Sequence, residues 1–124
     1  MAEVRFFGQT EHDYFSLQRA DAGATETIAL KASHVMGGTE KWNRDVRVAR
    51  AELSALADWL DNFWNDTPPV KLANGLIQFV YSHREHIGEG YYGVEFDGVR
   101  LLLAYEQLGG SNKFRAAEVR ALLD

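Results

Sequence analysis

The sequence has no cysteine among its 124 residues and only two prolines, which are adjacent at Pro68-Pro69. The lack of cysteine excludes disulfide bonds, thiolate metal ligands and a cysteine nucleophile. No apolar run approaches the roughly 20 residues that a membrane-spanning helix needs. The first residues also lack the basic and apolar regions of a secretion signal. We therefore expect a cytoplasmic protein that has no contact with a membrane.

The charge balance is mildly acidic, with 18 acidic and 13 basic side chains and a formal net charge of −5. This excess argues against sequence-independent binding to nucleic acid and is compatible with a basic protein partner. Hydrophobic residues make up 46% of the chain and charged residues 25%, as in ordinary soluble domains. We expect a single domain that spans residues 1–124.

Short runs rich in β-branched, aromatic and aliphatic residues occupy the first 50 positions, separated by glycine and polar residues. Such runs are typical of β-strands. Because side chains alternate along a strand, Trp42, Val46 and Val48 should share one face with Arg44 in the last of these runs. The four expected strands lie at residues 4–7, 14–18, 27–32 and 42–48.

The segment Arg50–Trp64 has the apolar periodicity of a helix that packs on a core. Asp58, Asp61 and Asn62 fall on the side opposite to the apolar stripe, and Trp59 lies at its edge. The helix should end near residues 65–66, because the two prolines that follow cannot continue it. The apolar stripe consists of Leu53, Leu56, Ala57, Leu60, Phe63 and Trp64.

Three further strands, at residues 76–83, 91–96 and 99–106, are predicted to form a meander. Asp97-Gly98 is typical of the type I′ turn that closes a two-residue hairpin. Counting back from this turn pairs apolar residues on one face and Glu95 with Arg100 on the other. The apolar pairs are Phe96 with Val99, Val94 with Leu101, and Tyr92 with Leu103.

The last twelve residues favour a short terminal helix, for which Ser111 or Asn112 is a suitable N-cap. The predicted order of elements is therefore β-β-β-β-α-β-β-β-α. This order indicates an α+β domain in which one or two antiparallel sheets are covered by the central helix. The apolar positions of the terminal helix are Phe114, Ala117, Val119, Leu122 and Leu123.

The stretch YSHREHIGEG, at residues 81–90, contains two histidines and two glutamates. If a strand continues through it, His83 and Glu85 point to one face while Arg84 and His86 point to the other. We interpret the stretch as a polar hairpin loop, and we expect no metal ion and no cofactor. The alternative is a metal-dependent or small-molecule site around His83 and His86, which would require a distorted strand.

Known catalytic motifs are missing from the rest of the sequence. No G-x-S-x-G elbow is present, and Gly37-Gly38 lies in a segment without the spacing of a P-loop. His12-Asp13 is interpreted as a polar turn before the second strand, although His12 or His34 could contribute to the alternative histidine site. We expect a protein that is not an enzyme.

Aromatic residues are abundant, with seven Phe, five Tyr and three Trp. Exposed aromatic side chains beside carboxylates would suit an interface with a basic protein. The alternative is that Trp59 seals the edge of the core and Tyr91 covers the outer face of the sheet. The candidate partner-binding residues are Asp58, Trp59, Asp61, Glu89, Tyr91 and Glu95.

The order of W-N-R-D-V-R-V, then A-E-L-S-A-L-A-D-W-L, then a β-meander resembles small cytoplasmic immunity proteins of bacterial polymorphic toxin systems. The resemblance spans residues 42–106, and it is to the family that neutralises wall-associated toxins or to similar uncharacterised small bacterial domains. It implies a non-catalytic protein that binds a cognate toxin domain, often a nuclease, and blocks its active site or its substrate. Because such interfaces vary between members, it assigns no individual binding residue here. A homodimer formed through a sheet face or an edge strand is a further alternative.

Overall fold

The computed structural model describes residues 3–8, 10, 12–20, 26–62, 68–84, 89–104 and 115–124. Within these residues the chain forms two four-stranded antiparallel sheets and two helices, which confirms the predicted α+β class. Sheet A has the strand order β1-β2-β3-β4, and sheet B has the order β5-β6-β7-β8. The elements are β1 (Glu3–Phe7), β2 (Tyr14–Arg19), β3 (Thr27–Met36), β4 (Thr39–Ala49), α1 (Arg50–Asn62), β5 (Val70–Leu72), β6 (Ile77–Arg84), β7 (Glu89–Phe96), β8 (Val99–Ala104) and α2 (Arg115–Ala121).

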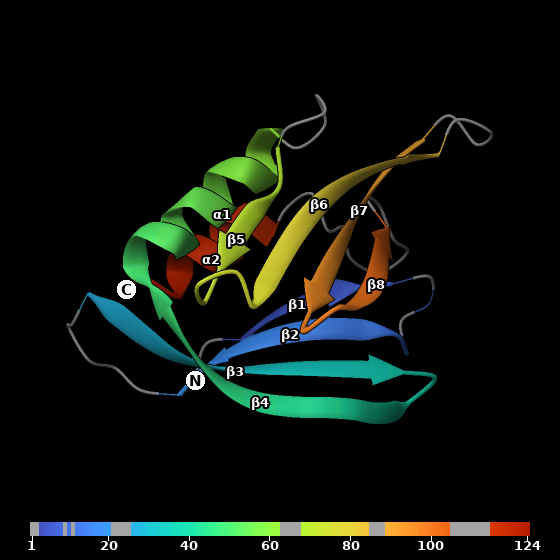
Figure 1. Cartoon of the computed structure of the whole chain (residues 1–124), viewed down its shortest axis with the longest axis horizontal. Coiled ribbons are helices and arrows are strands. Elements are labelled where there is room, and N and C mark those ends of the chain that lie inside the picture. Colours follow the sequence, from blue (N-terminus) through green and yellow to red (C-terminus); the bar gives the residue numbers. More distant parts are fainter. Residues whose placement is uncertain are drawn as a thin grey trace.

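The two layers of the molecule are visible in Figure 1. Sheet A forms one layer, and the other layer consists of the two helices at one end and sheet B at the other. Helix α1 contacts β4, β5 and α2, while α2 also contacts β1, and β8 contacts β1 and β2. The helices and sheet B therefore cover the same sheet, and together they enclose one core.

Strands β3 and β4 are longer than the sequence pattern predicted, because both continue to a two-residue turn at Gly37-Gly38. Both glycines have a positive φ, at 61° and 79°, which residues with a side chain rarely adopt. The pairing shifts between His34 and Val35, so that Lys41 is an extra residue in β4. Because the sequence prediction relied on regular alternation of side chains, this irregularity made both strands look shorter than they are.

The regular part of β4 has the predicted alternation. Val46 and Val48 are buried, whereas Asn43, Asp45 and Arg47 are exposed. The sequence therefore predicted correctly which face of this strand lies on the core.

The predicted register of the β7–β8 hairpin is confirmed pair by pair, including Glu95 opposite Arg100. Its turn residues Asp97 and Gly98 both have a positive φ, at 50° and 84°, as a type I′ turn requires. Val99 differs from expectation: it belongs to the apolar face but is 51% exposed, because it lies at the turn end of an edge strand.

Strand β5, at Val70–Leu72, is an eighth strand that the sequence pattern did not predict. It has only three residues and pairs with the start of β6. A run this short shows too little alternation to be separated from a loop. The seven-strand prediction was therefore one strand short.

Helix α1 has the predicted buried stripe at Leu53, Leu56, Ala57 and Leu60, while Phe63 and Trp64 lie outside the described residues. Its N-terminus is capped from within, because Glu52 Oε1 accepts a hydrogen bond of 2.9 Å from the backbone N–H of Ala49. The same oxygen accepts one of 3.3 Å from Ala73 N–H. One carboxylate thus joins the helix start to the turn between β5 and β6.

Helix α2 is shorter than predicted and uses a partly different face. Ala116, Val119 and Leu122 are buried, whereas Ala117, which we placed in the apolar stripe, is exposed. The proposed N-cap residues lie outside the described part of the chain. Arg115 lies over the ring of Phe7, at 5.4 Å from its centroid, which attaches α2 to β1.

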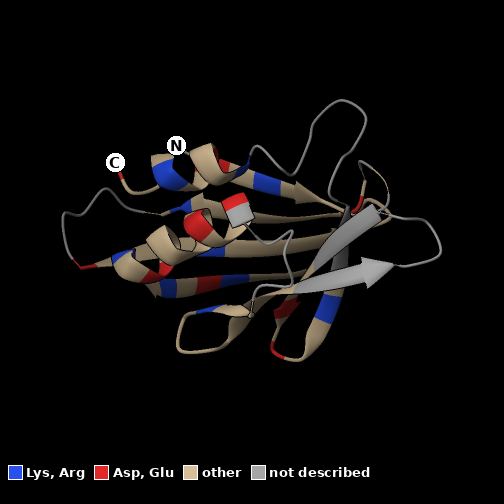
Figure 2. Ribbon diagram, turned by 90° about the horizontal axis from the view of Figure 1, so that it is seen from above, with Lys and Arg blue, Asp and Glu red and all other residues tan. Residues whose placement is uncertain are grey.

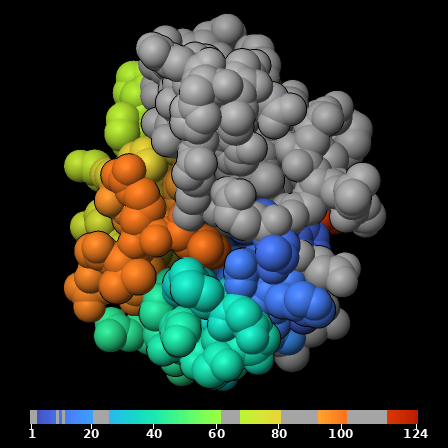
Figure 3. Space-filling view, turned by 90° about the vertical axis from the view of Figure 1, so that its right-hand side faces the viewer, coloured from blue at the N-terminus to red at the C-terminus, as the bar shows by residue number. Residues whose placement is uncertain are grey.

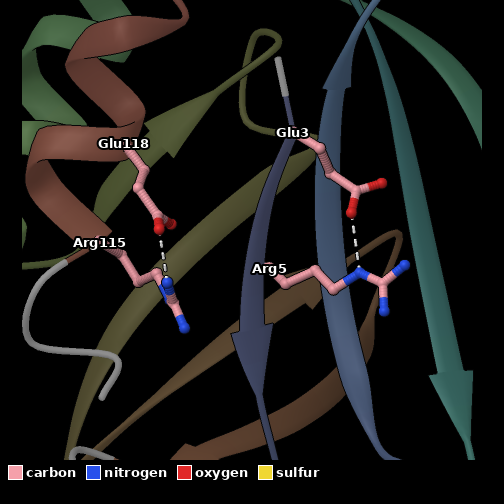
Figure 4. A network of polar contacts seen from close by, with 4 residues as sticks. All are labelled: Glu3, Arg5, Arg115 and Glu118. Carbon is pink, nitrogen blue, oxygen red and sulfur yellow. Dashed lines mark hydrogen bonds and ion pairs between the residues drawn. The ribbon is translucent and has the colours of Figure 1, made fainter. Parts of the chain in front are cut away.

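Ion pairs on α2 and β1 lie side by side at this contact (Figure 4). Arg115 pairs with Glu118 at 2.7 Å on α2, and Arg5 pairs with Glu3 at 2.8 Å on β1. Each pair is formed within one element, so neither joins the helix to the strand. The contact of α2 with β1 therefore depends on buried side chains and on the Arg115–Phe7 contact.

The centre of the core is an aromatic cluster that joins both sheets and α1. The ring of Phe79, from β6, lies 5.2 Å from that of Phe6 and 5.8 Å from that of Phe15 in sheet A. It lies 6.2 Å from the ring of Trp59 in α1. The cluster continues from Phe15 to Trp42, at 5.9 Å, and Trp42 stacks on Phe96 at 4.3 Å. Edge-to-face and stacked rings of this kind stabilise the fold beyond the area that they bury.

Candidate functional site

Acidic residues occur on α1 and around the β7–β8 turn, which are well separated in the fold (Figure 2). On α1, Asp58 and Asp61 are exposed, as the sequence predicted. Arg120 of α2 donates to both, at 3.1 Å to Asp58 and 2.7 Å to Asp61. The two hydrogen bonds to carboxylates raise the pKa of Arg120. This pair of carboxylates is therefore partly neutralised inside the molecule.

Trp59 lies in the core and not on the surface, which corrects the idea that it could serve as an exposed anchor. Its side chain is 7% exposed, and its ring packs on Phe79. The indole Nε1–H donates a hydrogen bond of 2.8 Å to the backbone carbonyl of Pro68. The alternative interpretation, in which Trp59 seals the edge of the core, agrees with this burial.

Glu89 and Tyr91 belong to β7, but their side chains lie outside the described part of the structure. Glu95 lies further along the same strand and is half-buried. Its carboxylate accepts hydrogen bonds from Arg100, at 2.9 Å, and from the side-chain amide of Gln78, at 2.9 Å. Glu95 thus belongs to a small polar network on the outer face of sheet B.

Next to this network is an open depression of about 300 Å³ between the β5–β6 and β7–β8 turns. The backbone N–H of Asp97 donates to the carbonyl of Leu76 at 3.1 Å, which holds the two turns together. Leu76 is 37% exposed. The depression is lined by Gly75, Leu76, Gln78, Glu95, Asp97 and Gly98.

Both carboxylates of this depression have an arginine partner, which is Arg100 for Glu95 and Arg44 for Asp97. Asp97 pairs with Arg44 of β4 at 3.4 Å, and the side chains of both residues are more than half exposed. Figure 3 shows the β3–β4 hairpin, in teal, against the β7–β8 hairpin, in orange. Exposed ion pairs of this kind contribute little to stability, so a competing cation could replace Arg44. The sequence identified Glu95 but missed Asp97 and Gln78, because a turn residue and a strand amide carry no functional signal alone.

The histidines do not form a metal site among the described residues. Strand β6 extends to Arg84, so His83 lies in a strand opposite Gly90, whereas His86 lies outside the described residues. The prediction that the two imidazoles face apart therefore stays a prediction. No group of three or more His, Asp or Glu side chains that could hold a metal ion occurs in the described ranges.

His12-Asp13 forms the polar turn that the sequence predicted. Gly37 N–H donates to the Asp13 carboxylate, and Gly38 N–H donates to the His12 carbonyl at 3.2 Å. This turn therefore fastens the end of the β1–β2 hairpin to the Gly-Gly turn of β3–β4, and Gly37-Gly38 acts as a hairpin turn.

His34 is the one buried histidine of the described residues, at 3% exposure. Its ring lies 5.6 Å from that of Trp42, and neither His34 Nε2 nor Trp42 Nε1 has a hydrogen-bond partner in the described structure. Burial lowers the pKa of His34, although the charge of Asp13 partly offsets this effect. His34 is therefore a neutral core residue at neutral pH.

Comparisons with known proteins add no family to these observations. A scan of the chain against protein-family models found no matching family, and searches of curated proteins and of solved structures found no match. None of the helices in the described ranges is long and apolar enough to cross a membrane.

Proposed function

We propose that this protein is a non-catalytic binding domain that contacts a basic protein through the acidic turn end of sheet B. We further propose that its partner is a toxin domain and that its role is that of an immunity protein. The observation that carries the first part is the depression in which Glu95, Asp97 and Gln78 lie beside the exposed side chain of Leu76.

The chemistry of this depression fits a lysine or arginine side chain on the partner. Carboxylates accept charge-assisted hydrogen bonds from such cations, and Gln78 supplies a neutral amide beside them. Leu76, which is 37% exposed, provides apolar area in the lining. An interface usually combines apolar contact with a few polar groups that fix orientation. The net charge of −5 would assist the approach of a basic partner.

The test is co-expression with a toxin encoded beside this protein, followed by growth and affinity measurements. We expect the chain to restore growth and to form a stable complex with the toxin domain. Glu95→Gln and Asp97→Asn should each weaken the complex about tenfold, because each removes one charged contact. Asparagine tolerates the positive φ of position 97, so the turn should survive.

The matched control is Glu26→Gln, which removes one negative charge at an exposed position outside the depression. It should leave the affinity unchanged. Equal weakening by all three variants would mean that only net charge matters and would reject the site. The absence of any complex with the toxin would reject the immunity role.

A further inference from the structure

Sheet A has two edge strands: β1 contacts α2 and β8, whereas β4 has β3 on one side and no strand on the other among the described residues. In Figure 1 it runs along the lower border of the molecule. The strand has eleven residues, and an unpaired edge of this length presents backbone N–H and C=O groups that can pair with another strand. By contrast, β5, at the edge of sheet B, has three residues and contacts α1.

The hydrogen bonds near the end of β4 identify which residues face the open edge. Arg50 N–H bonds to the carbonyl of Glu26, on the side of β3, whereas Ala49 N–H bonds to Glu52. Backbone groups alternate in direction along a strand. Counting back, the N–H and C=O groups of Asp45 and Arg47 point away from β3 and are available for pairing.

We propose that β4 pairs with β4 of a second copy of this chain, in antiparallel register centred on Val46. A two-fold axis through this point joins the two A sheets into one continuous antiparallel sheet of eight strands. The proposal does not depend on the acidic depression of sheet B, because the residues that it uses, Asp45 and Arg47, do not line that depression.

Charge selects this register from its neighbours. Centring on Val46 places Asp45 opposite Arg47 of the second copy, twice, and places the two valines opposite each other. Centring on Arg44 or on Asp45 would instead place that residue opposite its own copy, with like charges in direct contact, which is unfavourable. Registers closer to the turn would include the irregular pairing at Lys41.

The charged side chains that this register pairs are exposed and make at most weak contacts within the chain. The Asp45 side chain is 86% exposed, and its contact with Lys31 is long, at 3.9 Å. Arg47 is exposed and has no ion-pair partner in the described ranges. Alternating charges on an edge strand discourage pairing with unrelated strands, but here they are complementary to themselves.

The first test is sedimentation of the full chain over a range of concentrations. We expect a reversible dimer, which Arg47→Asp weakens about tenfold or more because it creates two like-charge pairs. The exchange variant Asp45→Arg/Arg47→Asp should restore it. Lys71→Asp is the control, because it makes an equal change of charge at an exposed residue of β5, and it should leave the dimer intact. A monomer at every concentration would overturn the proposal, and any partner strand for β4 would then have to come from a different protein.

The second test reads the register directly, because the protein has no cysteine of its own. Asp45→Cys and Arg47→Cys chains, mixed and oxidised, should form a disulfide-linked dimer, while either variant alone should not. Directly opposed residues lie within disulfide range, whereas diagonal neighbours do not. Cross-linking of Asp45→Cys alone, or a dimer insensitive to Arg47→Asp, would overturn the register.

Discussion

The edge strands β4 and β5 belong to two similar four-stranded meanders but are held in place differently. β4 follows β3 through a two-residue turn and pairs with it along its length, except at the extra residue Lys41. β5 is held by α1: Glu52 accepts from Ala73 N–H just after the strand, and Trp59 donates to the carbonyl of Pro68 just before it. The position of β4 thus depends mainly on its long pairing with β3, and that of β5 mainly on contacts with α1.

The largest expected effect comes from the ring that joins the two sheets. Phe79→Ala should reduce the free energy of unfolding by about 3–5 kcal/mol, because it empties a fully buried site between Phe6, Phe15 and Trp59. Urea denaturation followed by circular dichroism would measure this change. Leu76→Ala, on the exposed β5–β6 turn, is the control and should change stability by no more than about 0.5 kcal/mol. Similar values for both variants would contradict a shared core.

The second prediction separates the two edges. Glu52→Ala should cost about 1–2 kcal/mol, because Ala49 N–H and Ala73 N–H both lose their acceptor. Hydrogen exchange should show the amides of β5 losing more protection than those of β3 and β4, apart from Ala49, which bonds to Glu52 directly. Glu52→Gln, which keeps an acceptor oxygen, should retain most of the stability. Equal loss of protection in β4 and β5 would show that both edges depend on α1.

The third prediction concerns the β3–β4 and β7–β8 turns, which both have a positive φ at their two central residues. Gly38→Ala and Gly98→Ala should each cost about 1 kcal/mol, because alanine disfavours a positive φ. An added Cβ would meet no atom within 4 Å at either position, so steric overlap should not contribute. Thermal denaturation of the two variants would compare them. A much larger cost at one turn would indicate that its sheet depends more strongly on its hairpin.

These contrasts also explain how much the sequence could predict. The β7–β8 register followed from Asp97-Gly98 and simple alternation, and the buried stripe of α1 followed from its period. β5 was missed because three residues held by Glu52 and Trp59 carry no pattern of their own. The burial of Trp59 depends on the carbonyl of Pro68, nine positions further along, and periodicity does not contain that information.

The candidate site shows the same limit. Glu95 was found from sequence, because it pairs with Arg100 across a predicted hairpin. The depression was not, since it requires the β5–β6 turn to meet the β7–β8 turn through the Asp97–Leu76 hydrogen bond. That contact joins two turns separated by the whole of β6 and β7, so only the folded chain shows it.

The smallest expected effect is a change of stability with pH, which should originate in sheet A. Among the described residues, the buried polar side chains are Ser16 and His34, both in sheet A, and only the second titrates. Burial and Lys41 lower its pKa below the usual 6.5, while Asp13 raises it. As the pH falls through 6.5, the unfolded chain therefore takes up a proton that the folded chain does not.

Stability should accordingly be complete above this pH and decline below it, until the lower pKa of the folded state is reached. Urea denaturation at several pH values between about 7 and 5 would measure the slope. His34→Gln should flatten it, whereas His12→Gln, at an exposed position in the polar turn, should not. If the slope persisted unchanged in His34→Gln, the acid response would have to originate elsewhere, and this difference between the sheets would disappear.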